Sequence, residues 1–109
     1  MKKINGEELK NLLEAGEDLV VVEALPAEYY RSGHLPGAAH LPLESIDRRA
    51  ATVIPDRRAP VVVYCASDTC ENSHLAAKRL VELGYENVSV YPGGKADWKK
   101  LGHSLENAG

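Results

Sequence analysis

The chain has 109 residues, and 13 lysines and arginines stand against 16 aspartates and glutamates, so its formal net charge is −3. Its length predicts one domain over residues 1–109, and 44% hydrophobic with 27% charged residues excludes extensive disorder. The mild acidity excludes the basic face typical of nucleic-acid binding, and no apolar run approaches the roughly 18 residues of a membrane helix. We therefore expect neither a nucleic-acid partner nor a membrane partner.

The N-terminal residues are polar and lack the apolar stretch of a signal peptide, so we expect a cytoplasmic location. The chain has two cysteines, Cys65 and Cys70, which is too few for a disulfide scaffold.

The first predicted elements are a helix and a strand. Asn5 is followed three residues later by Glu8, as in a capping box, and a leucine-rich face then continues to a stop at Gly16. The apolar run at residues 19–22 does not alternate with polar residues, which indicates a strand covered on both faces.

The next stretch contains shorter elements. Residues 27–32 follow a proline and predict one or two helical turns. Residues 33–42 are too rich in glycine and proline for a helix interior, so we expect a turn that leads into a short strand at residues 39–41. Residues 43–52 have weak helical character.

The second half repeats the alternation of strand and helix. Residues 61–64 predict a buried strand that ends at Cys65, and a polar loop then leads to a helix over residues 73–83. Residues 88–91 predict the last strand, and a final helix carries Trp98 and Leu101. This order predicts a parallel sheet with helices on both sides.

Ligands of such sheets collect beyond the carboxyl ends of the strands, which is where Cys65 falls. An ordinary cysteine has a pKa near 8.5, and loop amides together with a helix N-terminus can lower it. We therefore expect an acidified, nucleophilic thiol at Cys65. The alternative is that this side chain only fills space under the edge of the sheet.

Cys70 has three interpretations: a resolving thiol for Cys65, a second sulfur acceptor, or an ordinary loop residue. A bridge between the two requires their Cα atoms to lie within about 7 Å.

Other chemistries have less support. The four histidines (His34, His40, His74 and His103) match no zinc spacing, so we expect no metal and no cofactor. Neither Ser67 nor Ser73 lies in a Gly-x-Ser-x-Gly pattern, and we expect Ser73 to cap the following helix. The Gly93-Gly94 pair lacks the ending of a phosphate-binding loop and predicts a turn with close backbone packing.

Three segments in register resemble the rhodanese-like domains. Residues 28–38 (Glu-Tyr-Tyr, then Gly-His-Leu-Pro-Gly-Ala) are similar to that family's Glu-Tyr and Gly-His-Ile-Pro-Gly-Ala segment. Residues 61–84 resemble its active-site strand, loop and helix, and residues 87–102 resemble its closing segment.

The resemblance implies a three-layer α/β/α fold with a five-stranded parallel sheet. It implies a sulfurtransferase in which Cys65 accepts sulfane sulfur, becomes a persulfide and passes the sulfur to a thiophilic acceptor. The partners would be a small sulfur donor and an acceptor thiol, including a protein thiol. The implied substrate loop consists of Ala66, Ser67, Asp68, Thr69, Cys70, Glu71, Asn72 and Ser73.

The sequence departs from the family in its charges and its loop length. Seven residues instead of five separate Cys65 from Ser73, and this loop contains acidic residues but no lysine or arginine. Residues 23–25 read Glu-Ala-Leu where the family often has Asp-Val-Arg. Because like charges repel a dianion at close range, we expect poor activity with thiosulfate.

Two alternatives remain open at the level of sequence. One is a non-enzymatic sulfur carrier or redox module that uses the pair Cys65 and Cys70. The other is a phosphatase or arsenate reductase of the same fold, which the longer loop favours and the missing loop arginine opposes.

Overall fold

The computed structural model describes residues 1–16 and 18–107, and within them five parallel strands form one sheet in the order β1-β5-β4-β2-β3. The strands are β1 (Lys2–Lys3), β2 (Val20–Glu23), β3 (Ala39–His40), β4 (Val61–Tyr64) and β5 (Val88–Tyr91). The helices are α1 (Gly6–Glu14), α2 (Ala27–Ser32), α3 (Ile46–Val53), α4 (Asn72–Glu82) and α5 (Gly94–Lys100), with a 3-10 turn η1 (Leu43–Ser45) before α3.

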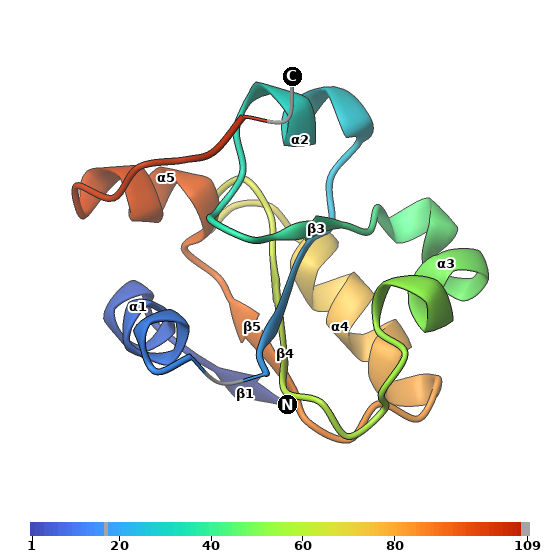
Figure 1. The fold of residues 1–109 in the computed structure, drawn as a ribbon. Helices are drawn as coiled ribbons and strands as arrows, with labels where there is room; N and C mark the ends of the chain where they lie inside the picture. The colour runs from blue at the N-terminus through green and yellow to red at the C-terminus, as the bar shows by residue number, and fades with distance from the viewer. Residues whose placement is uncertain (17, 108–109) are drawn as a thin grey trace.

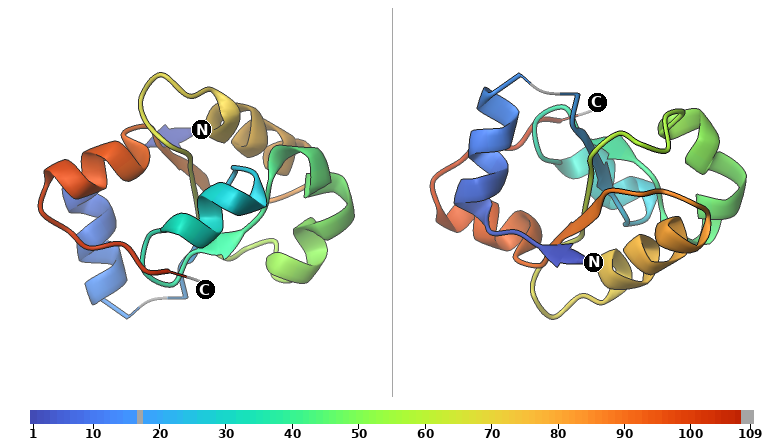
Figure 2. Two further views of the ribbon diagram at one scale, coloured as in Figure 1. Left: turned by 90° about the horizontal axis from the view of Figure 1, so that it is seen from above. Right: turned by 90° about the horizontal axis from the view of Figure 1, so that it is seen from below.

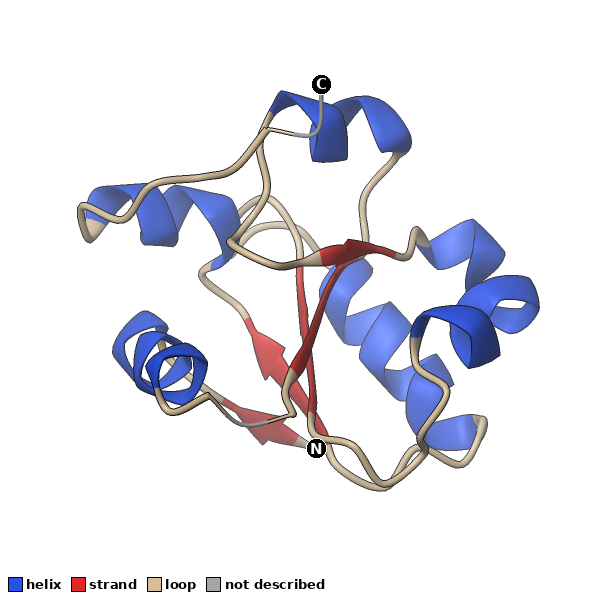
Figure 3. Cartoon of the chain, viewed as in Figure 1, coloured by secondary structure: helices blue, strands red, loops and turns tan. Residues whose placement is uncertain are grey.

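The elements form three layers. Helices α1 and α5 cover one face of the sheet, and α3 and α4 cover the other (Figures 1 and 3). The predicted α/β/α architecture with a five-stranded parallel sheet is therefore confirmed. Helix α2 lies beyond the end of the sheet at which β2 and β4 finish, so it borders the expected ligand edge (Figure 1).

Two apolar cores explain why the central strands are unbroken valine runs. Val63 packs with residues of α3 and α4, including Ile46 and Leu80. Its neighbour Val62 faces the opposite core, which includes Leu9 and Trp98. Because successive strand residues point to opposite faces, both sets are buried, and each such side chain contributes roughly 1.5–3 kcal/mol.

The predicted start of α1 is confirmed in detail. The Asn5 side chain accepts the Glu8 backbone N–H at 2.8 Å, and the Glu8 carboxylate accepts the Asn5 N–H at 3.0 Å. Gly16, just beyond the helix, has a φ of +70°, in the left-handed region that follows many helices.

Two local predictions need correction, and one strand was missed. Ser73 is not a cap: α4 begins at Asn72 after an N-cap at Glu71, so Ser73 lies in the first turn and is fully buried. Leu101 lies beyond α5 and is half exposed. Strand β1 was not predicted locally, because two exposed lysines carry no strand pattern and pair with β5 through the backbone alone.

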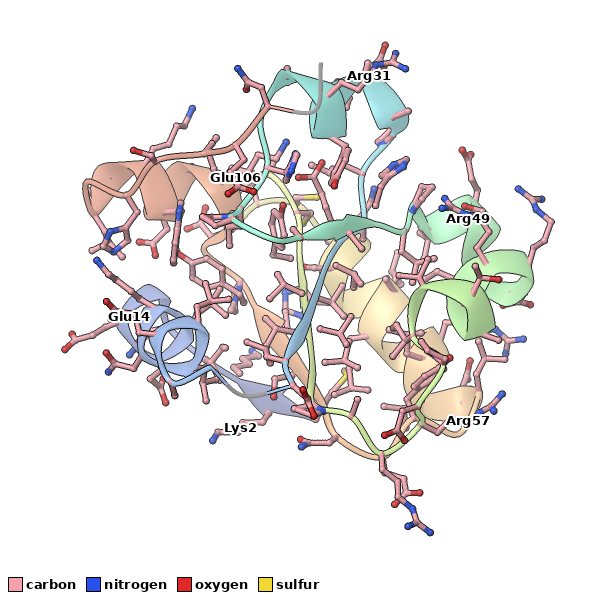
Figure 4. The ribbon with its side chains drawn as sticks, in the orientation of Figure 1. Lys2, Glu14, Arg31, Arg49, Arg57 and Glu106 are labelled. Carbon is pink, nitrogen blue, oxygen red and sulfur yellow. The ribbon has the colours of Figure 1, made fainter. Side chains whose placement is uncertain are left out.

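The segment after α5 returns to α2. Glu106 forms an antiparallel bridge with His34, and its carboxylate accepts the Gly37 N–H at 3.0 Å (Figure 4). Among the described helices, none has the length and apolar character to cross a bilayer.

Candidate active site

Cys65 directly follows β4, which lies between β5 and β2 in the middle of the sheet. Viewed from above, the chain leaves β4 and arcs over to the start of α4, with α5 on the other side of the arc (Figure 2). The Cys65 side chain is only 1% exposed. The thiol therefore lies underneath the loop that connects β4 to α4.

The loop is held by its own hydrogen bonds. The Cys70 N–H donates to the Ser67 carbonyl at 3.1 Å, and the Ser67 and Thr69 hydroxyls are 3.0 Å apart. The more exposed members of the loop are Asp68, Thr69 and Glu71; the half-buried ones are Ala66, Ser67, Cys70 and Asn72; Ser73 is fully buried. The predicted loop residues thus differ in their access to solvent, and two of them, Cys70 and Ser73, contact the Cys65 sulfur.

The start of α5 fixes the other side of the loop. Backbone N–H groups of Lys95 and Ala96 donate to the carbonyls of Cys65 and Ala66, at 3.1 and 2.9 Å. Gly94 has a φ of +63°, and a Cβ there would collide with the Cys65 carbonyl group. The prediction of a Gly-Gly turn with close backbone packing is confirmed, and the turn borders the candidate nucleophile.

Two oxygen atoms contact the thiol. The Sγ of Cys65 lies 3.3 Å from the Ser73 hydroxyl and 3.4 Å from the Cys70 carbonyl, and its single S–H group can donate to either oxygen. The sequence interpretation placed Ser73 in the implied substrate loop and as a helix cap, but it did not predict this contact with the sulfur. In the thiolate form, the same Ser73 hydroxyl can turn and donate to the sulfur.

The expected acidification of Cys65 is wrong for this conformation of the loop. Burial raises the pKa of the Cys65 thiol, and the neighbouring Cys70 side chain raises it further. The Ser73 hydroxyl and backbone N–H lower that pKa, but they do not outweigh burial. The carbonyl of Cys70, which faces the sulfur, occupies a place where we expected a donating amide.

A buried ion pair lies at the same edge of the sheet. The Glu23 side chain is fully buried at the end of β2, where it accepts the Tyr64 hydroxyl at 2.7 Å. The Lys95 ammonium group lies 3.1 Å from the same carboxylate oxygen and donates to the Tyr29 carbonyl at 2.7 Å. The other Glu23 oxygen has no partner among the described residues.

The sequence analysis identified Glu23 only as a departure from the family's pattern, without assigning it a place in the site, and it missed Lys95. The signal for Glu23 was a carboxylate at the end of an apolar strand, because such a group is not buried without a partner. No local signal identified Lys95 as that partner, since the pair joins residues that are far apart in the sequence. The Glu23–Lys95 pair joins α5 to β2 at the edge of the sheet where Cys65 lies.

Two hollows flank the loop and neither is basic. One, of about 230 Å³, contains Asp68 and Asp97 with a single lysine, Lys100. The other, of about 250 Å³, contains Glu44 and no lysine or arginine. The side chains of Arg31, Arg49 and Arg57 point outward at the periphery (Figure 4). The surroundings of the loop are thus acidic overall.

Tyr30 and two of the histidines form a cluster near α2. The Tyr30 ring stacks on His34 with 3.9 Å between ring centroids, and it lies 5.1 Å from the His40 ring. The Tyr30 hydroxyl donates to the Ala38 carbonyl, and the Tyr29 side chain is half exposed. These contacts are those of a packing cluster.

The comparisons with known proteins agree with this architecture. The family model of the rhodanese-like domain matches residues 5–101. The rhodanese-like domain of the Alr3790 protein from Anabaena sp., solved by NMR, superposes with a TM-score of 0.84 at 31% identity, over 98% of this chain and 80% of that one. The chain belongs to the rhodanese-like family.

Two curated relatives match this chain over only part of their own length. The chain is 38% identical over 61 residues to thiosulfate sulfurtransferase PspE of Escherichia coli, covering 56% of this chain and 57% of the relative. It is 33% identical over 95 residues to the HTH-type transcriptional regulator Rv0324 of Mycobacterium tuberculosis, covering 87% of this chain but 40% of the relative. The chain thus spans about two fifths to three fifths of these relatives.

Proposed function

We propose that residues 1–109 act as a single rhodanese-like domain that transfers sulfane sulfur through a persulfide on Cys65. The observation that carries this proposal is the position of the Cys65 sulfur. It lies at the carboxyl end of the central strand, beneath the loop that enters α4 and within contact of the Ser73 hydroxyl. Membership of the family, which includes sulfurtransferases among its named members, supports the same chemistry.

The proposed reaction has two displacement steps. The Cys65 thiolate attacks the sulfane sulfur of a donor, the donor's S–S bond breaks, and its electron pair leaves with the rest of the donor. The terminal sulfur of the resulting persulfide is then taken by an acceptor nucleophile, and Cys65 returns to a thiolate. No net oxidant or reductant is needed.

The burial of Cys65 determines when its thiol can attack a donor. Because burial raises the pKa of Cys65, the thiol is mostly protonated at neutral pH in the closed loop conformation. A donor reaches the sulfur only when the loop moves off it, and that movement also hydrates the sulfur and favours the thiolate. Ser73 stabilises the anion once it has formed.

The charges around the loop favour donors of low negative charge. Asp68 and Glu71 are exposed on the loop, and neither flanking hollow supplies a surplus of positive charge. Repulsion of a dianion by two nearby carboxylates costs on the order of 1 kcal/mol or more. We infer that thiosulfate is a poor donor and that organic persulfides, whose sulfane end carries at most one negative charge, are better ones.

The test measures thiocyanate formation from cyanide with thiosulfate and with an organic persulfide as alternative donors. The double variant Asp68→Asn/Glu71→Gln should raise kcat/KM for thiosulfate by about fivefold, the equivalent of 1 kcal/mol. Glu14→Gln, which removes a carboxylate from the distant helix α1, is the matched control (Figure 4). An unchanged thiosulfate rate in the double variant would show that loop charge does not select the donor.

A second candidate function is a non-enzymatic sulfur carrier or redox module. The observation in its favour is that Cys65 and Cys70 both carry free thiols in one loop. Treatment with a mild oxidant distinguishes it: a loss of two hydrogens in the intact mass indicates an internal disulfide. A gain of sulfur from a donor, followed by catalytic turnover, indicates the transferase.

A further inference from the structure

The two thiols of the loop differ in their access to solvent. Cys65 is buried, with 1% of its surface exposed, whereas Cys70 is half-buried on the outer part of the loop. A small movement of the loop lets a small donor reach Cys65, but a thiol on a second macromolecule needs a large opening. Sulfur captured at Cys65 therefore needs a route outward.

Cys70 lies next to the buried sulfur. Its carbonyl oxygen is 3.4 Å from the Sγ of Cys65. Since a carbonyl oxygen lies about 2.4 Å from the Cα of its own residue, the Cys70 Cα is within about 5.8 Å of that sulfur. The outer sulfur of a Cys65 persulfide would extend about 2 Å beyond Sγ, into the range that the Cys70 side chain can reach.

The geometry points to Cys70 as the relay that takes the sulfane sulfur from Cys65 and presents it at the surface to an acceptor thiol. This inference rests on the proposed function. In the step, the Cys70 thiolate attacks the outer sulfur of the neutral Cys65 persulfide, and the S–S bond to Cys65 breaks. The electron pair of that bond stays on the Cys65 sulfur, which takes the proton of the transferred S–H group.

The atoms and charges of this step balance. Before it, one thiolate and one protonated persulfide are present; after it, Cys65 is a neutral thiol and Cys70 carries the persulfide anion. Sulfur capture leaves a persulfide anion at Cys65, and a proton from the Cys70 thiol neutralises it before the step. Overall, an anion at the buried Cys65 is exchanged for an anion at the half-exposed Cys70, which is better hydrated. The outward direction is therefore favoured, and no oxidant or reductant is consumed.

The neighbouring residues of Cys70 indicate which acceptors fit. Asp68 and Glu71 are exposed on either side of it, so an anionic acceptor is repelled at the surface. A thiol on a neutral or basic peptide segment meets no such penalty. The relay thus serves a macromolecular acceptor, whereas small nucleophiles such as cyanide do not need it.

The experiment follows the sulfur between the two residues. The wild-type chain is mixed with polysulfide, quenched at intervals with iodoacetamide, and cleaved on the N-terminal side of aspartate. Cleavage before Asp68 places Cys65 and Cys70 on different peptides, so the mass gain of one sulfur can be assigned to each. We expect the gain to appear first on Cys65 and then on Cys70.

Two variants test whether the sulfur on Cys70 comes from Cys65. In Cys65→Ser, Cys70 should gain no sulfur over the same interval, because it receives sulfur from Cys65. In Cys70→Ser, release of preloaded sulfur to a cysteine-containing basic peptide should slow by roughly tenfold or more, while release to cyanide should change much less. Ala51→Ser, at an exposed position of α3 outside the loop, is the matched control.

The outcomes separate the relay from the proposed function. Sulfur that stays on Cys65, or that reaches Cys70 equally fast in Cys65→Ser, overturns the relay. A Cys65–Cys70 disulfide after loading also overturns it, since attack then occurs at the inner sulfur with expulsion of hydrosulfide. A chain that gains no sulfur at either residue contradicts the proposed function itself.

Discussion

Replacing Lys95 by methionine tests the role of the Glu23–Lys95 ion pair, which lies at the same sheet edge as the loop between β4 and α4. The variant keeps the length and most of the apolar stem of the side chain but removes its charge. The Glu23 carboxylate, fully buried, then retains only the Tyr64 hydroxyl as a partner, because its other oxygen already has none among the described residues. A buried charge without compensation is among the most destabilising features that a single substitution can create.

The magnitude follows from the geometry. Two unit charges 3.1 Å apart attract by about 5 kcal/mol at an effective dielectric constant of 20. The variant no longer has to desolvate the ammonium group, which offsets part of this loss. We expect Lys95→Met to lower the free energy of unfolding by about 3–5 kcal/mol, and Tm by more than about 12 °C.

The assay is urea denaturation, with Lys99→Met on the exposed side of α5 as the matched control. That control should change the free energy of unfolding by less than about 0.5 kcal/mol. The double variant Glu23→Gln/Lys95→Met should recover part of the loss, because it removes the uncompensated charge. If Lys95→Met is no less stable than Lys99→Met, the account of the pair as a buried, mutually dependent unit is wrong.

Further predictions concern the loop itself. Gly94→Ala should destabilise the chain by about 1–3 kcal/mol or more and slow sulfur capture, because Gly94 has a positive φ and the new Cβ would collide with the Cys65 backbone. Gly102→Ala is the control: Gly102 also has a positive φ but lies in open space, so this variant should leave sulfur capture unchanged. Equal effects of the two substitutions on sulfur capture would contradict this reasoning. The rate of Cys65 alkylation by iodoacetamide should rise with pH through a midpoint above the ordinary value of about 8.5. Ser73→Ala should move that midpoint higher, and a lower midpoint would contradict the assigned contact.

The raised pKa of Cys65 also makes the stability of the folded chain depend on alkaline pH. The Cys65 thiol ionises at a lower pH in the unfolded chain than in the folded one, so its contribution to the free energy of unfolding is fully present below about pH 8.5. It is lost as the pH rises through the folded-state pKa. Cys65→Ser should therefore unfold with a weaker dependence on alkaline pH than the wild-type chain, as thermal denaturation between neutral and alkaline pH would measure.

The fold was predictable because local patterns and global architecture agree. The valine runs of β2 and β4 required cover on both faces, and the capping box at Asn5 marked the start of α1. Strand β1 was not predictable locally, since its pairing with β5 uses backbone groups and two exposed lysines. Whether residues 2–3 form a strand depends on the backbone edge that β5 offers for pairing.

The site was predictable in position but not in electrostatics. The strand-to-helix pattern placed Cys65 at the sheet edge, yet the pKa of its thiol depends first on its burial and then on which loop groups face the sulfur. The Cys70 carbonyl and the Ser73 hydroxyl face it, and their orientation follows from the path of the loop over the sulfur. The partnership of Glu23 with Lys95 was likewise inaccessible, because it joins β2 to α5 across most of the sequence.

The most direct test of the central claim is the intact mass of the chain after incubation with polysulfide, compared between the wild type and Cys65→Ser. The account predicts that the wild-type chain gains one sulfur atom, which cyanide removes, and that Cys65→Ser gains none. A wild-type chain that takes up no sulfur, or a Cys65→Ser variant that takes it up at the wild-type rate, would contradict the assignment of Cys65 as the nucleophile.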